Sequence, residues 1–113
     1  MPEPNIIAEV EKCLEHAEVR MMQTDFADIP TSETLYQEAT DLLIRAEGLM
    51  KGSGAWLMSC MHARRDNGSM CVVWLERARN ASMLPDLATI RAHAHFAKAK
   101  DAKWFKEWQK KHR

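Results

Sequence analysis

Sulfur and imidazole side chains gather in residues 58–71, and these are the side chains of the chain most able to do chemistry. The stretch contains Met58, Cys60, Met61, His62, Met70 and Cys71. Thioether and thiolate ligands suit Cu(I), and imidazole binds several transition-metal ions. The spacing argues against a metal site, because Cys60 and Met61 do not share the helical face of His62 and no pair repeats at zinc-finger spacing. Packing in a helix interface is the preferred interpretation, and a small metal-handling protein is the alternative.

Catalysis needs a nucleophile or a general base whose partners face it. Cys60 and His62 are two positions apart, so they point to different sides of a helix. The same holds for His93 and His95. The sequence contains no nucleophile elbow, glycine-rich phosphate loop or HExxH motif. We therefore expect no catalytic residue, no bound metal and no cofactor.

The sulfur residues belong to a predicted helical hairpin over residues 54–81. Four residues of its first half recur at three- and four-residue steps and share one helical face: Ala55, Met58, Ser59 and His62. The second half has an equivalent face, formed by Cys71, Val72, Leu75 and Ala78. Between the halves, residues 64–68 are polar and end in glycine, so they predict a turn. Ser69 is predicted to cap the second helix.

Apolar stripes predict two longer helices ahead of this hairpin. The first should run over about residues 5–22 with Asn5 as its cap. The second should run over about residues 33–51, capped by Thr31 or Ser32. Both stripes follow three- and four-residue steps, which places their apolar residues on one face for packing.

Two segments should interrupt these helices. Residues 24–30 should form a break, because Pro30 disfavours helical backbone at Ile29 and the segment is rich in turn-forming aspartate. Gly52 and Gly54 should end the second helix, because glycine readily adopts the positive φ of a helix C-terminus.

The spacing of small and large residues in the hairpin resembles a tetratricopeptide (TPR) repeat. In that family the second helix carries a small residue, a bulky one four later and an alanine three after that. Here these positions hold Cys71, Leu75 and Ala78. A similar trio lies 32 residues earlier, close to the 34-residue TPR period: Ala39, Leu43 and Ala46. Pro30 departs from the pattern, so the first hairpin should have a longer connection than the family norm.

The resemblance implies an all-α fold: a TPR-like stack of antiparallel helical hairpins with five or six helices. The chain would be a single TPR-like domain over residues 1–113. Residues 5–51 would form an irregular first hairpin, 54–81 the TPR-like hairpin and 85–113 the C-terminal capping helices. Two hairpins are fewer than the three repeats usually needed, so either the C-terminal helices or a second copy must complete the core. A homodimer therefore stays among the expected assemblies.

By the same resemblance the protein is expected to be a non-catalytic protein–protein interaction module: an adaptor, a scaffold or a client-binding chaperone for a protein or peptide partner. In this family the first helix of each hairpin lines the binding groove. The candidates are Trp56, Ser59, Cys60, Met61 and Ala63. Arg64 and Arg65 at the hairpin turn are added, because a guanidinium group pairs well with a carboxylate.

A net charge of zero hides a strong asymmetry along the chain. Residues 1–50 hold eleven Asp or Glu against three Lys or Arg, whereas residues 91–113 hold eight Lys or Arg against two acids. Two solvated faces that happen to differ in sign are the simpler interpretation. The alternative is that one end meets an oppositely charged partner, or that two copies meet head to tail. A nucleic-acid binder is the alternative, through the lysines beside Trp104, Phe105 and Trp108. The spacing of these rings instead favours a buried stripe, so nucleic-acid binding is not expected.

The composition is typical of a soluble globular domain, with 46% apolar and 28% charged residues. No run of about 18 apolar residues is present, and residues 1–4 lack the features of a secretory signal. The three cysteines form an odd set without CxxC spacing, which argues against a disulfide framework. We expect a cytoplasmic protein that does not enter a membrane.

Overall fold

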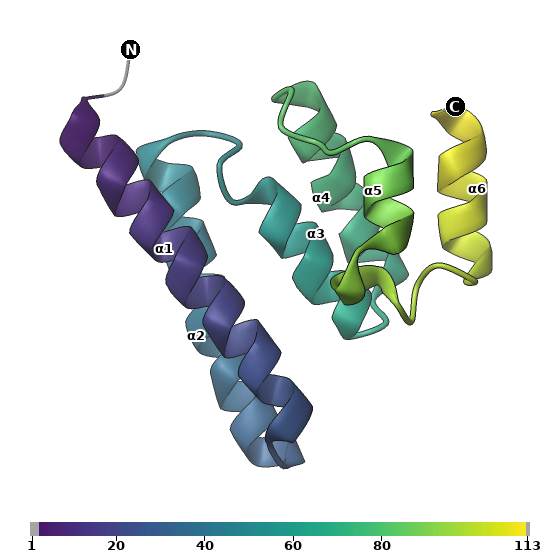
Figure 1. The fold of residues 1–113 in the computed structure, drawn as a ribbon, viewed down its shortest axis with the longest axis horizontal. Coiled ribbons are helices and arrows are strands. Elements are labelled where there is room, and N and C mark those ends of the chain that lie inside the picture. Colours follow the sequence, from purple (N-terminus) through teal and green to yellow (C-terminus); the bar gives the residue numbers. More distant parts are fainter. Residues whose placement is uncertain (1–2, 113) are drawn as a thin grey trace.

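The computed structural model describes residues 3–112, which form six α-helices and two short 3-10 helices without a strand (Figure 1). The predicted all-α class with five or six helices is confirmed. In chain order the elements are α1 (Pro4–Gln23), η1 (Thr24–Phe26), α2 (Ile29–Leu49), α3 (Ala55–Arg64), α4 (Gly68–Asn80), α5 (Leu87–Ala92), η2 (Ala94–Phe96) and α6 (Lys103–Lys111). None of these helices has the length and apolar character needed to cross a lipid bilayer.

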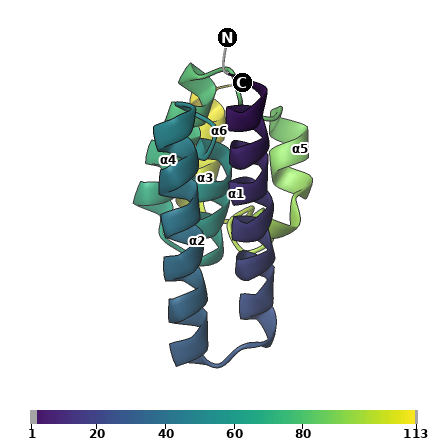
Figure 2. The same ribbon diagram turned by 90° about the vertical axis from the view of Figure 1, so that its left-hand side faces the viewer.

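Helices α1 and α2 form a long antiparallel hairpin along one side of the molecule (Figures 1 and 2). Its closed end, at η1, extends beyond the other helices (Figure 2). The apolar stripes of the two helices face each other and supply their buried residues: Val10, Cys13, Ala17 and Met21 of α1, with Ala39, Leu43 and Ala46 of α2. Asp25 and Glu33 at this closed end pair with Arg64 and Arg65, so the hairpin is tied to the end of α3.

Helix α2 begins at Ile29, four residues before its predicted start. Asp28 caps it, since its side chain accepts a hydrogen bond from the backbone N–H of Thr31 at 2.8 Å. Pro30 lies in the first turn, where its missing N–H costs no helical hydrogen bond and its fixed φ suits the helix. Pro30 therefore starts the helix that it was expected to delay.

Two other predicted caps are wrong. Helix α1 begins at Pro4, so Asn5 lies inside its first turn. Helix α4 is capped by Asn67, whose side-chain oxygen accepts a hydrogen bond from the backbone N–H of Met70 at 3.4 Å. Ser69, the predicted cap, lies within α4. In each case several adjacent residues can cap, and periodicity alone does not choose among them.

Glu47 holds the turn from α2 to α3. Its carboxylate accepts hydrogen bonds from the backbone N–H groups of Gly52 at 3.0 Å and Gly54 at 2.7 Å. Ser53 Oγ donates to the carbonyl oxygen of Ala46 at 2.9 Å. Gly52 has a φ of 90°, which residues with a side chain rarely adopt. This turn brings the start of α3 directly against α2.

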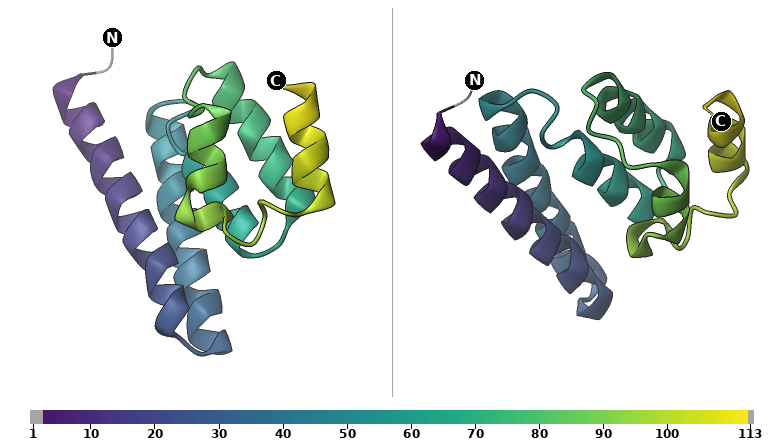
Figure 3. Two further views of the ribbon diagram at one scale, coloured as in Figure 1. Left: turned by 45° about the vertical axis from the view of Figure 1, so that its right-hand side comes forward. Right: turned by 45° about the horizontal axis from the view of Figure 1, so that its top comes forward.

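Helix α3 runs through the middle of the fold (Figure 3). The long hairpin, α4 and η2 all pack against it. It buries Ala55, Leu57, Met58, Ser59, Cys60, Met61 and Ala63. The sequence predicted one buried face on this helix, but residues on other faces are buried as well, because η2 also packs against α3.

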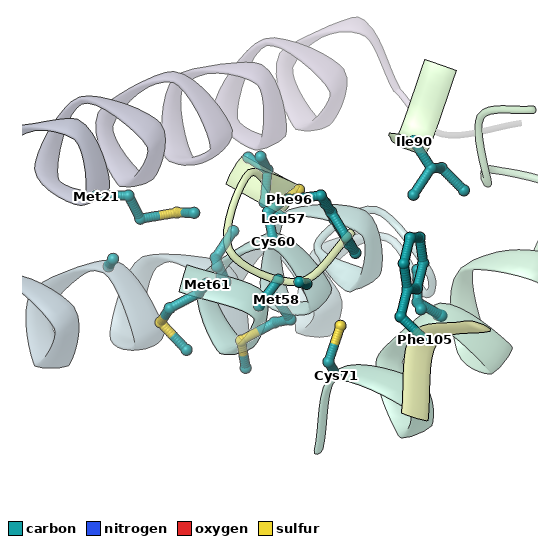
Figure 4. Packing of buried hydrophobic residues seen from close by; sticks show 14 of the residues in the cluster. Met21, Leu57, Met58, Cys60, Met61, Cys71, Ile90, Phe96 and Phe105 are labelled. Carbon is teal, nitrogen blue, oxygen red and sulfur yellow. The ribbon is translucent and has the colours of Figure 1, made fainter. Parts of the chain in front are cut away.

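The apolar core is continuous from α1 to α6. Figure 4 shows Met21 of α1 and Phe105 of α6 at the two sides of one cluster. Phe96 of η2 joins its parts, with its ring centroid 5.5 Å from that of Trp56 and 5.4 Å from that of Phe105. Trp108 and Phe105 are both buried, so α6 closes the apolar edge of the core.

Candidate functional site

Four of the predicted partner-binding residues lie inside the core. Ser59, Cys60 and Ala63 expose no surface, and Met61 exposes 2%. Figure 4 shows Cys60 and Met61 among the packed core side chains. None of the four can line an open groove, which corrects the sequence prediction. The physical reason is that the long hairpin and η2 enclose α3 from both sides.

Trp56, the fifth candidate on α3, is half-buried. Its ring stacks on Phe96 and meets the edge of His93, with centroid distances of 5.5 Å in both cases. The chain's own segment 93–96 thus covers the face of α3 that the resemblance assigned to a partner. A partner could reach Trp56 only at its remaining exposed edge.

Arg64 and Arg65, the last two candidates, line a surface cleft of about 820 Å³. The cleft lies between the closed end of the long hairpin, the α3–α4 turn and the segment around η2. Its charged lining residues are Asp25, Glu33, Arg64, Arg65, Asp66 and Lys98. Both signs of charge therefore lie within one concave surface.

Arg64 joins the closed end of the hairpin to η2. Its Nη2 pairs with Asp25 and donates to Thr24 Oγ1 at 3.4 Å. Its Nη1 donates to His95 Nδ1 at 3.0 Å. The Arg64 side chain is largely buried, so these contacts fix its position on the wall of the cleft.

His95 is buried and has a partner at each ring nitrogen. Nδ1 accepts from Arg64, and Nε2 lies 3.0 Å from Glu18 Oε2, to which it donates. These partners assign the neutral Nε2–H tautomer. Burial lowers the pKa of His95, the hydrogen bond to Glu18 opposes this, and the charges of Arg64 and His93 lower the pKa further, so the result is below the ordinary value. His95 thus acts as a neutral structural link without a free ring nitrogen.

Arg65 lies closer to solvent than Arg64. Its Nη2 donates to both carboxylate oxygens of Glu33, at 2.9 and 2.8 Å, and its guanidinium lies 4.7 Å from the centre of the Tyr36 ring. Thr24 Oγ1 donates to the Tyr36 hydroxyl at 3.2 Å. Both predicted arginines therefore pair with carboxylates of their own chain, partners that the sequence prediction did not identify.

The sequence analysis missed the two most exposed large apolar side chains of the described residues. Phe26 and Ile29 are 94% and 81% exposed, and Met22 lies close by at 55%. We call Met22, Phe26 and Ile29 the apolar tip. Asp25 and Ser32, close to it in sequence, line the cleft, so the tip borders the cleft. A usable signal was present: two large apolar residues stand in a segment predicted to be a polar break.

The cysteines weighed as metal ligands are buried thiols. Burial raises the pKa of Cys60 well above its ordinary value and the pKa of Cys71 to about 12. Metal binding requires the thiolate, which these surroundings disfavour. Within residues 3–112, no three His, Cys, Asp or Glu side chains lie together as a ligand group.

The aromatic residues weighed as a nucleic-acid platform pack on the protein. Phe105 and Trp108 are buried in the core. Trp104 lies on Gly68, where an added Cβ would come within 2.8 Å of the indole ring. The lysines of α6 are exposed, but the aromatic rings beside them pack against the protein itself.

A smaller pocket of about 370 Å³ lies between the α4–α5 connection and the end of α6. We call it the C-terminal pocket; it is lined by Arg79, Ser82, Leu84, Pro85, Asp86, Leu87, Trp108 and His112. Glu76 orders one wall, since it accepts hydrogen bonds from Trp108 Nε1 at 2.8 Å and His112 Nε2 at 2.6 Å. Burial raises the pKa of Glu76, but these hydrogen bonds and the charge of His112 outweigh it, so the pKa is lowered overall.

The cleft and the apolar tip both lie at the closed end of the long hairpin. The cleft lining carries charges of both signs, and the exposed apolar side chains of the tip are close in sequence to its lining residues Asp25 and Ser32. The C-terminal pocket is a separate concave site. Comparison of the chain with protein-family models, curated proteins and solved structures found no match.

Proposed function

We propose that this protein is a non-catalytic protein–protein interaction module, acting as an adaptor, scaffold or client-binding chaperone, and that it binds its partner at the apolar tip and the adjoining cleft. The observation that carries the proposal is the exposure of Phe26 and Ile29 beside a charged cleft. Exposed apolar groups rimmed by polar residues mark interaction sites. Buried aromatic side chains also supply much of the binding energy of protein interfaces.

The cleft would supply the polar part of this interface. Arg65 and Glu33 are exposed enough that their ion pair stabilises the fold by only about 1 kcal/mol or less. A carboxylate of the partner can therefore compete with Glu33 for Arg65 at small cost. Arg64 is held by its own hydrogen bonds, and Lys98 adds a third cation to the lining.

The surroundings of His95 support this proposal over catalysis in the cleft. Both ring nitrogens of His95 are engaged, so the buried histidine is not free to act as a general base. A TPR-like stack of helical hairpins stays part of the proposal. The proposed binding surface differs from the groove that the resemblance implies, because segment 93–96 packs on Trp56 of α3.

Affinity purification of the tagged protein from its native source, followed by mass spectrometry, tests the proposal. The double variant Phe26→Ser, Ile29→Ser removes the apolar side chains from an exposed position and should leave the fold intact. Recovery of the partner should fall by at least about tenfold, as expected for loss of a central apolar contact. The matched control is Ile44→Ser, an exposed apolar residue on the same α2 but remote from the tip.

A photo-crosslinking residue locates the contact independently. Placed at position 66, on the wall of the cleft, it should label the partner. Placed at position 11, on an exposed part of α1 nearer its start, it should not. Equal recovery of the partner with all three proteins, or labelling only from position 11, would refute the proposal.

A further inference from the structure

The apolar tip carries acidic neighbours. Phe26 lies between Asp25 and Asp28, and Ile29 follows directly. Asp28 is exposed, and more than half of the Asp25 side chain is exposed although it pairs with Arg64. The tip therefore presents two large apolar side chains flanked by negative charge, at the end of the acidic half of the chain.

The C-terminal pocket has the opposite character. Its apolar walls come from Leu84, Pro85, Leu87 and Trp108. Arg79 lines it, and Lys110 and Lys111 are exposed at the end of α6, in the basic segment of the chain. Its volume of about 370 Å³ is within the range of sites that take an aromatic side chain.

Asp86 lines the pocket, and Glu76 contacts two of its lining residues. Both carboxylates accept hydrogen bonds within the chain. Asp86 caps α5, accepting the backbone N–H of Thr89 at 2.8 Å. Glu76 is held by Trp108 and His112. Arg79 and Asp86 are both exposed and line the pocket, so its lining carries both signs of charge, and the exposed Lys110 and Lys111 at the end of α6 add positive charge. The apolar pocket walls and this basic end of α6 thus match the apolar, acidic tip.

The two surfaces lie at opposite ends of the molecule. Figures 1 and 2 show the closed end of the long hairpin at one end, with the α4–α5 connection and the end of α6 at the other. Because the two surfaces lie at opposite ends, a tip cannot enter the pocket of its own chain. The matching occupant for the pocket is the tip of a second copy.

We propose that copies of this chain associate head to tail, with Phe26 and Ile29 of one copy seated in the C-terminal pocket of the next. The inference rests on the proposed role of the tip as a binding surface and names one partner for it. The contact is heterologous, since two different surfaces meet. Successive copies therefore add in the same direction and form either a closed ring or an open filament.

Sedimentation velocity over a range of protein concentrations tests the association. The weight-average mass should rise above the 13.0 kDa of one chain as concentration increases. Association should weaken by about tenfold between about 0.05 and 0.5 M salt, because exposed charges are screened. A mass that stays at one chain up to about millimolar protein, where weak association would show, overturns the inference.

Two single-sided variants identify the surfaces. The tip variant Phe26→Ser, Ile29→Ser keeps the pocket, and the pocket variant Arg79→Glu, Lys110→Glu keeps the tip. Each should be monomeric alone. Mixed together, they should form a one-to-one dimer that grows no further, because one intact pocket meets one intact tip.

Controls separate this contact from general stickiness or general charge attraction. Ile44→Ser removes an exposed apolar side chain elsewhere, and Lys12→Glu reverses an exposed charge on α1, away from α6 and the pocket lining. Both should associate like the unaltered protein. If either control loses association as fully as the matched variant, or if the mixture stays monomeric, the inference is wrong. A monomeric protein whose tip variant still loses its cellular partner would refute self-association and leave the proposed function standing.

Discussion

His95 donates a hydrogen bond to Glu18 and accepts one from Arg64, and it can do both only while it is neutral. Protonation at Nδ1 would place a hydrogen against the Arg64 guanidinium, in a buried site where charge is costly. The residue therefore couples the protonation state of one ring to the contact between the long hairpin and η2. Neither partner is near His95 in sequence.

The free energy of unfolding should fall as pH drops below about 6.5. A histidine in the unfolded chain has a pKa near 6.5, and the pKa of His95 in the fold is lower. Between the two values the unfolded chain binds more protons, so acidification favours unfolding. The contribution of His95 is complete above the unfolded pKa and is lost as pH falls through the folded one. Urea unfolding between pH 8 and pH 5 measures this.

The variant His95→Gln keeps an N–H donor and removes the titration. It should be less stable than the unaltered protein at pH 8 and lose less stability on acidification. Burial also lowers the pKa of His62, so some pH dependence should remain. His16→Gln, at an exposed position of α1, is the control and should behave like the unaltered protein. An unchanged pH slope in His95→Gln would contradict the assignment.

The helices themselves could be predicted, because each apolar repeat is contained within the segment that folds. The stripe ending at Met21 and the trio around Leu75 identify α1 and α4 without reference to any other part of the chain. Their ends were harder to predict, because Asp28 and Thr31 are both good caps and only the backbone path of residues 24–30 decides between them.

The covering of α3 could not be predicted from sequence. Residues 93–99 show no helical or strand period, and their place depends on remote contacts: Phe96 with Trp56, and His95 with Glu18. Together with the long hairpin, that segment encloses α3, whose Cys60 and Ala63 the resemblance placed in the binding groove. Arg64 and Arg65 were predicted as site residues, and both line the cleft. The ability of a guanidinium group to pair with a carboxylate does not depend on how the rest of the chain folds.

The joint between α2 and α3 depends on a close approach at Gly54. A Cβ there would lie 2.7 Å from the carbonyl oxygen of Leu43 and 3.3 Å from Glu47 Cγ. Gly54→Ala should therefore push the helices apart and lower the free energy of unfolding by about 1–3 kcal/mol. Gly48→Ala is the matched control, because nothing lies within 4 Å of its added Cβ.

Gly48 lies within α2, where alanine is the better helix former. Gly48→Ala should therefore stabilise the protein by up to about 1 kcal/mol. Urea unfolding of both variants measures the two effects, and their opposite signs make the test specific. A Gly54→Ala protein as stable as the unaltered one would show that the helices can separate without cost.

One apolar cluster joins α1 and α2 to the later helices, so the two halves of the molecule should unfold together. All four tryptophans lie between residues 56 and 108, whereas α1 and α2 contribute about half of the helical residues. Tryptophan fluorescence therefore reports on the C-terminal helices, and far-UV circular dichroism is weighted toward the long hairpin. The two unfolding transitions should coincide, as expected for a single cooperative domain.

Phe105→Ala tests this coupling from the far side of the core. Removing a fully buried ring should cost about 3–5 kcal/mol and shift both transitions equally. Lys103→Ala, on the exposed face of the same helix, should shift neither. A fluorescence transition that moves while the helical signal does not would show that the long hairpin is stable by itself.

The buried state of all three cysteines has a consequence for when the chain is chemically vulnerable. Once folded, Cys60 and Cys71 are protonated thiols sealed from oxidants, so the surrounding redox conditions hardly act on them. Before the core closes, during synthesis or after a full opening, the same thiols are accessible and reactive. Non-native disulfide bonds can therefore form only before the chain folds or after it has unfolded, and burial of the thiols in the core prevents them in between.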